Sequence, residues 1–405
     1  MSIITIFSGS YCNEESVIKE ILRRTGYKEI TDREIVAKAS GLSGISDGKI
    51  LKAFSSKTSV FNQLTHDKEC SIAFMKLALA ETLAEDNILI YGFSSMLVPA
   101  GIAHVLRICL IAEMKYRISQ AVSSGMSENE SLKMIHKSDE DKASWTKSVL
   151  GKDDPWNTSS YDMVLTTDRT SPEDIAGLVE KVLEKDVLKS SVESQRAIQD
   201  FILAASVETA LVKAGHIIAA ESKAGAVTLT INKKVLLLKR LEEELQALAL
   251  KIPGVQSVST KVGKDFYQSD IYRKFDFEMP AKLLLVDDER QFVQTLSERL
   301  QMREIGSVVA YDGESALDIM KEEEPEVMIL DLKMPGIDGI EVLKRVKNTN
   351  PSIEVIMLTG QGSEADKETC MKLGAFAYLE KPVDVNVLSE TIQKANEKIM
   401  QKRKG

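Results

Sequence analysis

Cysteine, histidine and basic residues are too few or too scattered to support several common classes of protein. The four cysteines form no Cys-x-x-Cys pair and the four histidines have no metal-ligand spacing, so neither a disulfide framework nor a zinc site is predicted. The 52 lysines and arginines are outnumbered by 61 acids, for a net charge of -9. Because nucleic-acid binding proteins usually have a basic surface, we expect no nucleic-acid partner. We expect a cytoplasmic protein in a reducing compartment.

Long uninterrupted apolar segments are also lacking. The longest, residues 96–114, contains His104 and Arg107, which a bilayer would penalise. The first 15 residues have no basic region before their apolar stretch and end in Glu14 and Glu15, unlike a signal peptide. The sequence therefore predicts no transmembrane helix.

The composition and the apolar patterning indicate a multidomain α/β protein. A chain of 405 residues that is 43% hydrophobic and 28% charged is typical of soluble proteins with two to four domains. Apolar runs alternate with amphipathic segments over residues 1–195 and 281–405, which predicts two α/β domains with parallel sheets. Residues 197–265 have the pattern of a smaller α/β unit, and residues 266–280 are predicted to be a linker.

Several polar side chains follow the predicted strands of the carboxy-terminal domain. Asp287 and Asp288 come directly after KLLLV, and Asp331 ends VMILD. Because the carboxyl ends of parallel strands meet at one edge of a sheet, we expect these three carboxylates to converge. Such a cluster needs a cation, and Mg²⁺ suits carboxylate ligands. Thr359 and Lys381 end two later strands at the same edge, where a hydroxyl and an ammonium could hold a phosphoryl group.

These residues, in the segments VDDE, LDLKMPGIDG, MLTG and YLEKP, resemble the receiver domain of two-component response regulators over residues 281–405. An isolated Asp-Asp pair is more often a solvated turn, but four matching segments in family order argue against that interpretation. The resemblance implies a doubly wound, five-stranded parallel sheet, a Mg²⁺ cofactor and a sensor histidine kinase as partner. It further implies the following roles: Asp331 as phosphoacceptor, Asp287, Asp288, Asp331 and the Lys333 carbonyl as metal ligands, Thr359 and Lys381 as phosphoryl contacts, Tyr378 as switch, and a cis Lys381–Pro382 bond.

The amino-terminal segment has the order strand, turn, helix, which is where a phosphate-binding loop would lie. Together with residues 104–145 and 159–179, it resembles the cytidylate kinase-like family over about residues 1–185. In that family the first loop is rich in glycine, so that its amides can surround a phosphate. Here Cys12, Glu14 and Glu15 stand in place of glycines, and no Walker lysine is present.

This departure argues against catalysis by the kinase-like domain. One carboxylate about 5 Å from a phosphate costs roughly 3 kcal/mol at an effective dielectric near 20, which is more than a hundredfold in affinity. Lys142 stands where the family has an arginine, while Arg117 and Asp139 fall on family-like positions and Arg169 follows a strand end. We predict a degenerate, kinase-like scaffold. The alternative is a receiver-regulated nucleoside monophosphate kinase of the cytidylate type.

The middle segment resembles the BON domain through VTLTINKK, an amphipathic helix and KIPGVQSVSTKV, with Pro253 and Gly254 forming the turn. The resemblance implies a compact unit that binds phospholipid or another partner. A packing module between the larger domains remains an equal alternative, and three consecutive glutamates in the helix argue against membrane contact. The favoured interpretation is a response regulator phosphorylated on Asp331 that signals through its kinase-like and BON-like domains or a downstream protein partner.

Overall fold

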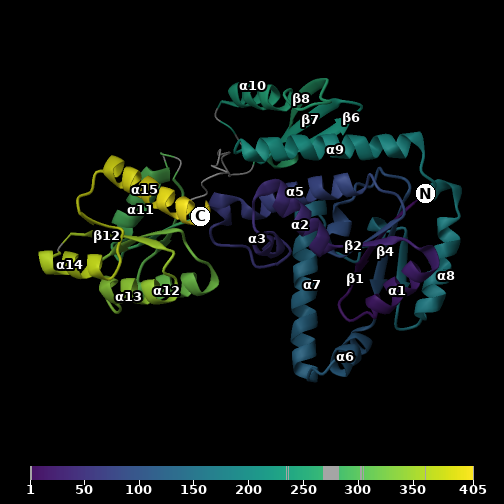
Figure 1. The fold of residues 1–405 in the computed structure, drawn as a ribbon, viewed down its shortest axis with the longest axis horizontal. Helices are drawn as coiled ribbons and strands as arrows, with labels where there is room; N and C mark the ends of the chain where they lie inside the picture. Colours follow the sequence, from purple (N-terminus) through teal and green to yellow (C-terminus); the bar gives the residue numbers. More distant parts are fainter. Residues whose placement is uncertain are drawn as a thin grey trace. The chain divides into compact units, whose positions relative to one another are not determined.

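In the computed structural model, the chain forms two compact units, one of residues 1–58 with 67–272 and one of residues 59–66 with 273–405 (Figure 1). The structure describes residues 2–233, 235, 237–267, 282–301, 303, 305–360 and 362–404. Within these ranges no helix is both long and apolar enough to cross a membrane. The predicted linker, residues 266–280, lies almost wholly outside the described residues; its first two residues end a short 3-10 helix, Lys264–Tyr267.

The first unit contains a five-stranded parallel sheet in the order β2-β3-β1-β4-β5. Most of its strands are short apolar runs of the amino-terminal segment, although β2 has the sequence KEIT, and every residue of β1 is buried. The strands are β1 (Ile3–Ser8), β2 (Lys28–Thr31), β3 (Ile88–Tyr91), β4 (Val105–Ile111) and β5 (Met163–Thr166). The prediction of an α/β domain here is confirmed.

Helices connect these strands and cover the sheet (Figure 1). They are α1 (Glu14–Thr25), α2 (Asp32–Ser43), α3 (Asp47–Lys52), α5 (Asp67–Thr82), α6 (Met114–Ser123), α7 (Glu128–Leu150) and α8 (Pro172–Leu183). The 23-residue α7 begins at a capping box formed by Ser127 and Glu130 and ends at Gly151, whose φ is 66°. Short 3-10 helices lie at Phe93–Leu97 (η1), Thr158–Ser160 (η2) and Asp186–Leu188 (η3).

The smaller α/β arrangement predicted for residues 197–265 is present within the same unit. It consists of α9 (Val192–Lys213), β6 (Ala219–Lys223), β7 (Ala226–Ile231), α10 (Leu238–Ala249) and β8 (Ser257–Val262). Strand β7 pairs antiparallel with β6 and parallel with β8. Its alternate residues Val227, Leu229 and Ile231 are buried together with side chains of α9 and α10. Helix α9 also packs against α5 (Figure 1), so it contacts both parts of the unit.

The second unit contains the other five-stranded parallel sheet, in the order β10-β9-β11-β12-β13. The strands are β9 (Leu283–Val286), β10 (Ser307–Ala310), β11 (Val327–Asp331), β12 (Glu354–Thr359) and β13 (Ala377–Glu380). The helices are α11 (Arg290–Gln301), α12 (Gly313–Glu322), α13 (Gly339–Thr349), α14 (Glu364–Lys372) and α15 (Val385–Lys404), and this unit also includes α4 (Asn62–Thr65). Two separate apolar cores cover the two faces of the sheet, as expected for a doubly wound fold.

Candidate functional site

The predicted acid cluster lies at the carboxyl edge of the second sheet. Strand β11 is central and pairs with both β9 and β12, with Leu330 opposite Val286 and Asp331 opposite Leu358. Asp287, which follows Val286, is therefore brought beside Asp331. Both carboxylates are nearly inaccessible, with Asp287 3% and Asp331 5% exposed. The convergence expected from strand order is thus present for these two residues.

Lys381 joins the two buried carboxylates. Its Nζ lies 2.6 Å from Asp287 Oδ2 and 2.9 Å from Asp331 Oδ1, and 3.4 Å from the exposed Glu289. Burial alone would lower the pKa of Lys381, but hydrogen bonds to Asp287 and Asp331 outweigh burial and raise it. Burial raises the pKa of Asp287, and the hydrogen bonds from Lys381 and the Glu289 amide oppose that rise. One protonated lysine therefore neutralises much of the charge that two adjacent aspartates create.

The backbone fixes the position of Asp331. The amide of Lys333 donates to Asp331 Oδ2 at 2.8 Å, so both carboxylate oxygens have a donor. Gly339 approaches this turn so closely that a Cβ would lie 2.1 Å from the Asp331 carbonyl oxygen. Gly339, the last residue of the segment LDLKMPGIDG, must therefore be glycine because any side chain would collide with the backbone at Asp331. This requirement was not predicted from the sequence.

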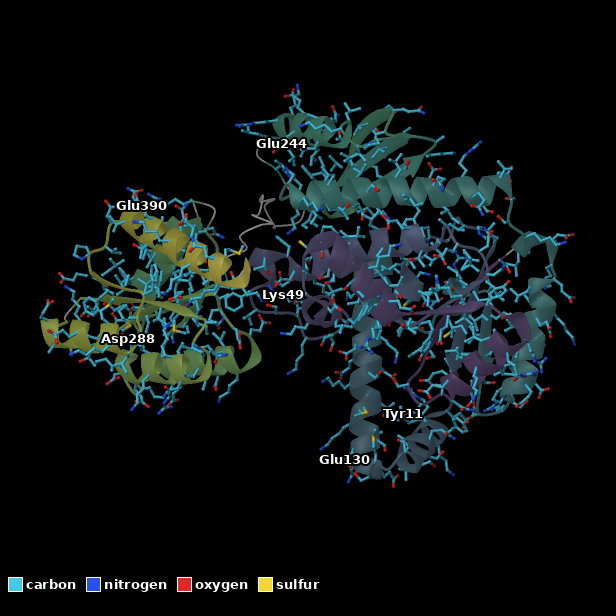
Figure 2. All side chains as sticks on the ribbon, viewed as in Figure 1. Tyr11, Lys49, Glu130, Glu244, Asp288 and Glu390 are labelled. Carbon is cyan, nitrogen blue, oxygen red and sulfur yellow. The ribbon has the colours of Figure 1, made fainter. Side chains whose placement is uncertain are left out.

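Asp288, the third predicted carboxylate, differs from this pair in its exposure. It is exposed and is labelled in Figure 2. Within the described ranges, no group of three or more His, Cys, Asp and Glu side chains is arranged to hold a metal ion. Mg²⁺, however, commonly uses only one or two carboxylates with several waters, and three aspartates at one sheet edge supply suitable oxygen ligands. The residues present therefore fit Mg²⁺ in kind, with Lys381 occupying the position between two of them.

Thr359 and Tyr378 lie on the neighbouring strands β12 and β13. Thr359 is 2% exposed, and its carbonyl accepts a hydrogen bond from the Lys381 amide at 2.7 Å. The Tyr378 hydroxyl is buried and has no hydrogen-bond partner among the residues that the structure places. A Cβ on Gly362 would lie 1.8 Å from this hydroxyl, so the tyrosine occupies space that only glycine leaves free. Gly362 was not predicted from the sequence. The peptide bond Lys381–Pro382 is cis, as predicted.

The loop after β1 is the corresponding region of the first sheet. Tyr11 and Asn13 have φ values of 61° and 53°, in the left-handed region that favours glycine. The left-handed positions are therefore Tyr11 and Asn13, whereas the family resemblance placed the replaced glycines at Cys12, Glu14 and Glu15. Glu14 and Glu15 instead form the first turn of α1, where their charge is favourable to the helix dipole.

Three predicted residues of the kinase-like domain converge on this loop, at Ser10. Arg117 donates to the Ser10 carbonyl at 2.8 Å and makes a bidentate ion pair with Asp139, at 2.7 and 2.9 Å. Lys142 donates to the hydroxyls of Ser10 and Ser138 at 2.7 and 2.8 Å. Lys142 is only 8% exposed, and burial lowers its pKa. The cations at the loop therefore bind groups of the chain itself.

The surroundings of the loop are also occupied. A Cβ on Gly9 would lie 2.8 Å from the Cys12 sulfur, and the Tyr11 hydroxyl donates to the sulfur atoms of Met126 and Met134. Tyr11 is labelled in Figure 2. Arg169 does not join the cluster, because it is exposed and pairs with Glu113 and Asp168. The contacts of Ser10 and Ser138 were not predicted, since nothing in their sequence context distinguishes them from other surface serines.

Comparison with known proteins finds matches for both the carboxy-terminal and the amino-terminal segments. Residues 283–393 match the family model of the response regulator receiver domain, and residues 3–169 match that of the cytidylate kinase-like family. Over 101 residues, 25% of this chain and 43% of the relative, the sequence is 44% identical to the transcriptional regulatory protein CpxR of Escherichia coli strain K12. The match to the same protein of Shigella flexneri is equal. The chain thus spans less than half the length of these curated relatives.

Solved structures that resemble part of this chain include receiver domains. The receiver domain of the Francisella response regulator 1452 is 29% identical, with a TM-score of 0.28, over 29% of this chain and 98% of that one. A receiver domain protein from Clostridium thermocellum is 35% identical, with a TM-score of 0.28, over 29% of this chain and 95% of that one. On the family and sequence matches, the carboxy-terminal domain is similar to response regulator receiver domains, and the amino-terminal domain is similar to the cytidylate kinase-like family.

Proposed function

We propose that this protein is a two-component response regulator whose Asp331 accepts a phosphoryl group from a sensor histidine kinase. The observation that supports the proposal most directly is the Asp287–Lys381–Asp331 arrangement at the carboxyl edge of a receiver-domain sheet. A carboxylate oxygen of Asp331 would attack the phosphorus atom of the phosphoryl group on the histidine of the kinase. This attack would form an acyl phosphate on Asp331 and release the histidine. The backbone amide of Lys333, which already contacts Asp331, would hold the attacking group in place.

The neighbouring side chains have distinct roles in this proposal. Lys381 already contacts Asp331 and would transfer its contact to a phosphoryl oxygen, compensating the added charge. The Thr359 hydroxyl would donate to another phosphoryl oxygen. Asp287, Asp288, Asp331 and the Lys333 carbonyl would hold Mg²⁺, which supplies positive charge to the phosphoryl group when bound. The exposed Asp288 leaves this side of the site open to solvent and to a partner.

Tyr378 is the proposed link between phosphorylation and the surface. Its hydroxyl is buried against Gly362 without a hydrogen-bond partner among the described residues, so small movements of the Thr359 loop can displace it. Such a displacement would alter the surface near β13, through which we propose that a downstream protein partner is contacted. The kinase-like domain and residues 197–265, interpreted as BON-like, are the proposed output elements within the chain. We place the protein in the cytoplasm, where a histidine kinase would meet the receiver domain.

The alternative function, a nucleoside monophosphate kinase, is disfavoured by the loop after β1. Arg117 is paired with Asp139, Lys142 binds two serines, and Glu14 and Glu15 place negative charge at the start of α1. Calorimetric titration of MgATP and of CMP into the full chain, with and without beryllofluoride, separates the two functions. Nucleotide binding that strengthens with beryllofluoride would favour a regulated kinase. Beryllofluoride binding without nucleotide binding would favour a receiver that controls a noncatalytic scaffold.

Phosphorylation can be tested directly with radiolabelled acetyl phosphate and millimolar Mg²⁺. We expect the full chain to incorporate label and Asp331→Ala to incorporate none. Asp318→Ala is the matched control, because Asp318 is an exposed residue of α12 whose ion pair with Lys321 lies outside the site. Equal labelling of the wild type and Asp331→Ala, or no labelling of the wild type, would overturn the proposal.

A further inference from the structure

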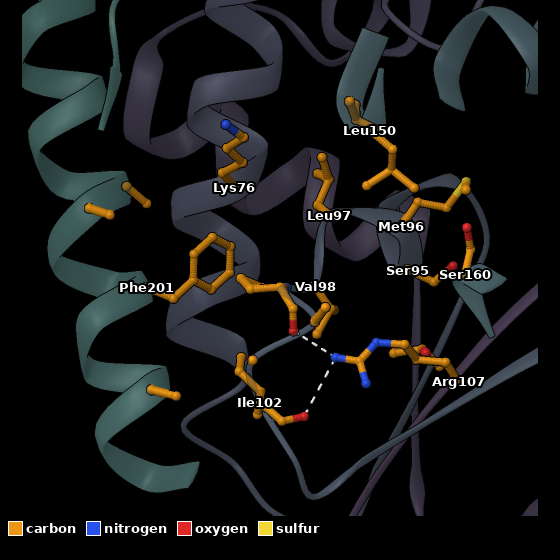
Figure 3. A pocket seen from close by; sticks show the side chains of 18 of the residues that line it. Lys76, Ser95, Met96, Leu97, Val98, Ile102, Arg107, Leu150, Ser160 and Phe201 are labelled. Carbon is orange, nitrogen blue, oxygen red and sulfur yellow. Dashed lines mark hydrogen bonds between the residues drawn. The ribbon is translucent and has the colours of Figure 1, made fainter. Parts of the chain in front are cut away.

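A cavity of about 680 Å³ lies inside the first unit, away from the loop after β1. It is bordered by β1 and β4, the segment that follows η1, the end of α7 with η2, and α9 with β6 (Figure 3). Its volume falls within the range of roughly 300–1,000 Å³ found for small-molecule sites. Helix α9 and strand β6 lie beyond residues 3–169, the range that matches the cytidylate kinase-like family. The cavity is therefore lined partly by residues outside that range.

The cavity wall is mainly apolar. Figure 3 shows large side chains from several elements directed into the same space. They are Met96, Leu97, Val98, Ile102, Leu150 and Phe201. Leu150 is 41% exposed although it belongs to this wall, so an apolar surface remains accessible to a molecule that enters. An apolar group of a ligand would remove this surface from water.

Arg107 places a positive charge at the base of this wall. Its side chain is only 16% exposed, and its guanidinium donates to the carbonyl oxygens of Pro99, Ile102 and Val105 (Figure 3). The carboxylate paired with it, Asp162, lies at 3.9 Å, beyond hydrogen-bond distance. Carbonyl oxygens orient a guanidinium without neutralising it. Arg107 is therefore a largely buried cation whose charge is incompletely compensated.

A second cation borders the cavity at Lys152. Its Nζ donates to the hydroxyls of Ser159 and Ser160, at 3.3 and 2.8 Å, and no carboxylate of the described residues pairs with it. Arg107, Lys152 and Ser160 all line this cavity, and Figure 3 shows Ser160 on the same side of it as Arg107. Hydroxyl groups can rotate to donate to a ligand, which makes Ser160 a second potential contact for an anion.

The acidic residues of the cavity wall are already bound to other groups. Glu208 pairs with Lys76 at 3.0 Å, Glu221 pairs with Lys261 at 2.9 Å, and Asp200 accepts from the Ala224 amide at 2.7 Å and the Ser222 hydroxyl at 3.3 Å. These carboxylates belong to α9 and β6, whereas Arg107 and Lys152 belong to β4 and the residues after α7. A fourth carboxylate of the wall, Asp162, lies beside Arg107 and accepts a hydrogen bond from the Arg107 backbone amide at 2.8 Å. The incompletely compensated positive charge of Arg107 and Lys152 thus lies on one side of the cavity.

From these observations we infer that the cavity binds a small organic anion, composed of an apolar body and a single carboxylate or phosphate group. The anionic group contacts Arg107 and Lys152, and the apolar body lies against Val98, Leu150 and Phe201. A ligand so placed touches both the parallel sheet and α9, and therefore couples the kinase-like part of the unit to the middle part.

Octanoate, octyl phosphate and octanol are suitable probes, because they share one apolar chain and differ in the head group. We expect calorimetric titration of the full chain to show that at least one anion binds about tenfold or more tightly than octanol. Whichever anion binds more tightly identifies the head group. The same anion is expected to raise the thermal unfolding midpoint, because it binds only the folded unit.

Two variants test the assignment of the cations. Arg107→Gln and Lys152→Gln are each expected to weaken binding of the anion by about tenfold while leaving octanol binding unchanged. Lys152→Gln keeps the test valid if Arg107→Gln fails to fold, because Lys152 donates only to two hydroxyls. Lys19→Gln, an exposed lysine of α1 outside the cavity, is the matched control.

Two results would overturn the inference. One is octanol binding as tightly as both anions, which would show that the cations make no contact. The other is the absence of binding by all three probes up to millimolar concentration. Binding of an anion that is unaffected by Lys152→Gln and by Arg107→Gln would equally place it elsewhere on the protein.

Discussion

The two parallel sheets of this chain differ in how the charged side chains at their carboxyl edges are paired. At the receiver edge, Lys381 bridges Asp287 and Asp331, while Asp288 remains exposed. At the edge near β1, Arg117 is paired with Asp139 and donates to Ser10, which also binds Lys142. The receiver site therefore retains an open acidic group, whereas the cations of the other site are bound by the chain itself. A similar sheet architecture can thus hold an open acidic site or a site whose cations are bound by the chain itself.

The difference arises from a few side chains rather than from the fold. Both sheets have five parallel strands, and both present the turn after a central strand to the site. The loop after β1 even keeps two left-handed residues, Tyr11 and Asn13, although neither is glycine. The left-handed conformation in this loop therefore does not depend on glycine, and backbone similarity does not by itself establish activity.

The largest expected effect is on the receiver site, from Lys381→Gln. This change leaves Asp287 and Asp331 buried together without a cation, and we expect the free energy of unfolding at pH 7 to fall by about 3 kcal/mol. Millimolar Mg²⁺ should restore more stability to the variant than to the wild type, because the metal can replace the missing charge. Equilibrium urea unfolding with and without Mg²⁺ measures both effects.

Lys344→Gln, an exposed residue of α13, is the control for this experiment and is expected to change stability by less than about 0.5 kcal/mol. If Lys381→Gln is as stable as this control without Mg²⁺, the ion pairs of Lys381 contribute little. The exposed carboxylate of Asp288 would then be the feature that distinguishes the carboxyl edge of the second sheet from that of the first.

A second prediction concerns the packing of Tyr378. Gly362→Ala places a methyl group where the Tyr378 hydroxyl lies, 1.8 Å from the ideal Cβ position, so the ring must move. We expect a loss of about 1–3 kcal/mol in stability and a changed NMR environment of the Tyr378 ring. Gly360→Ala is the matched control, because its Cβ would approach only Lys381, at 3.9 Å. An unchanged Tyr378 resonance in Gly362→Ala would show that the Tyr378 hydroxyl does not lie against Gly362.

A third prediction concerns pH and the first unit. His104 is fully buried, and neither ring nitrogen has a hydrogen-bond partner among the described residues. Burial lowers the pKa of His104, so the folded state resists its protonation. The unfolded chain binds this proton near pH 6.5, and stability should therefore fall as the pH drops through that value.

Urea unfolding at a series of pH values from about 8 to about 5 measures this dependence. His104→Phe should flatten the decline, because it removes the titrating group, whereas His136→Gln, an exposed residue of α7, should leave it unchanged. A decline that is equally steep in His104→Phe would assign the pH dependence to other groups of the chain.

The sequence predicted the receiver site in more detail than the rest of the molecule. Strand ends in a parallel sheet bring known positions together, so Asp287, Asp331, Thr359 and Lys381 could be grouped from the order of the apolar runs alone. Asp288 was placed in the same cluster, and its side chain is exposed whereas that of Asp287 is buried, because successive residues of an extended segment point in opposite directions. Sequence order defines which strand ends meet but does not define every side-chain direction.

Other features depend on contacts between distant residues and were therefore not predicted. Gly362 is required by Tyr378, and Ser10 is held by Lys142, which lies 132 positions away in the chain. Strand β6 was also missed, since its alternating small and charged residues, AAESK, have little β-strand character. The first loop was interpreted by aligning glycines, but its left-handed residues are Tyr11 and Asn13, a property of the backbone and not of residue identity.

The smallest expected effect distinguishes conformation from chemistry in that loop. At Asn13, where φ is 53°, alanine should lower stability by about 1 kcal/mol, because a Cβ is unfavourable in the left-handed region. Glycine at the same position should stay within about 0.5 kcal/mol of the wild type, since relief of strain offsets its greater freedom in the unfolded chain. At Lys19, an exposed residue within α1, the order should reverse, with glycine less stable than alanine by about 0.5–1 kcal/mol. Thermal unfolding of these four variants measures both orders, and alanine more stable than glycine at residue 13 would show that this residue does not have the left-handed conformation.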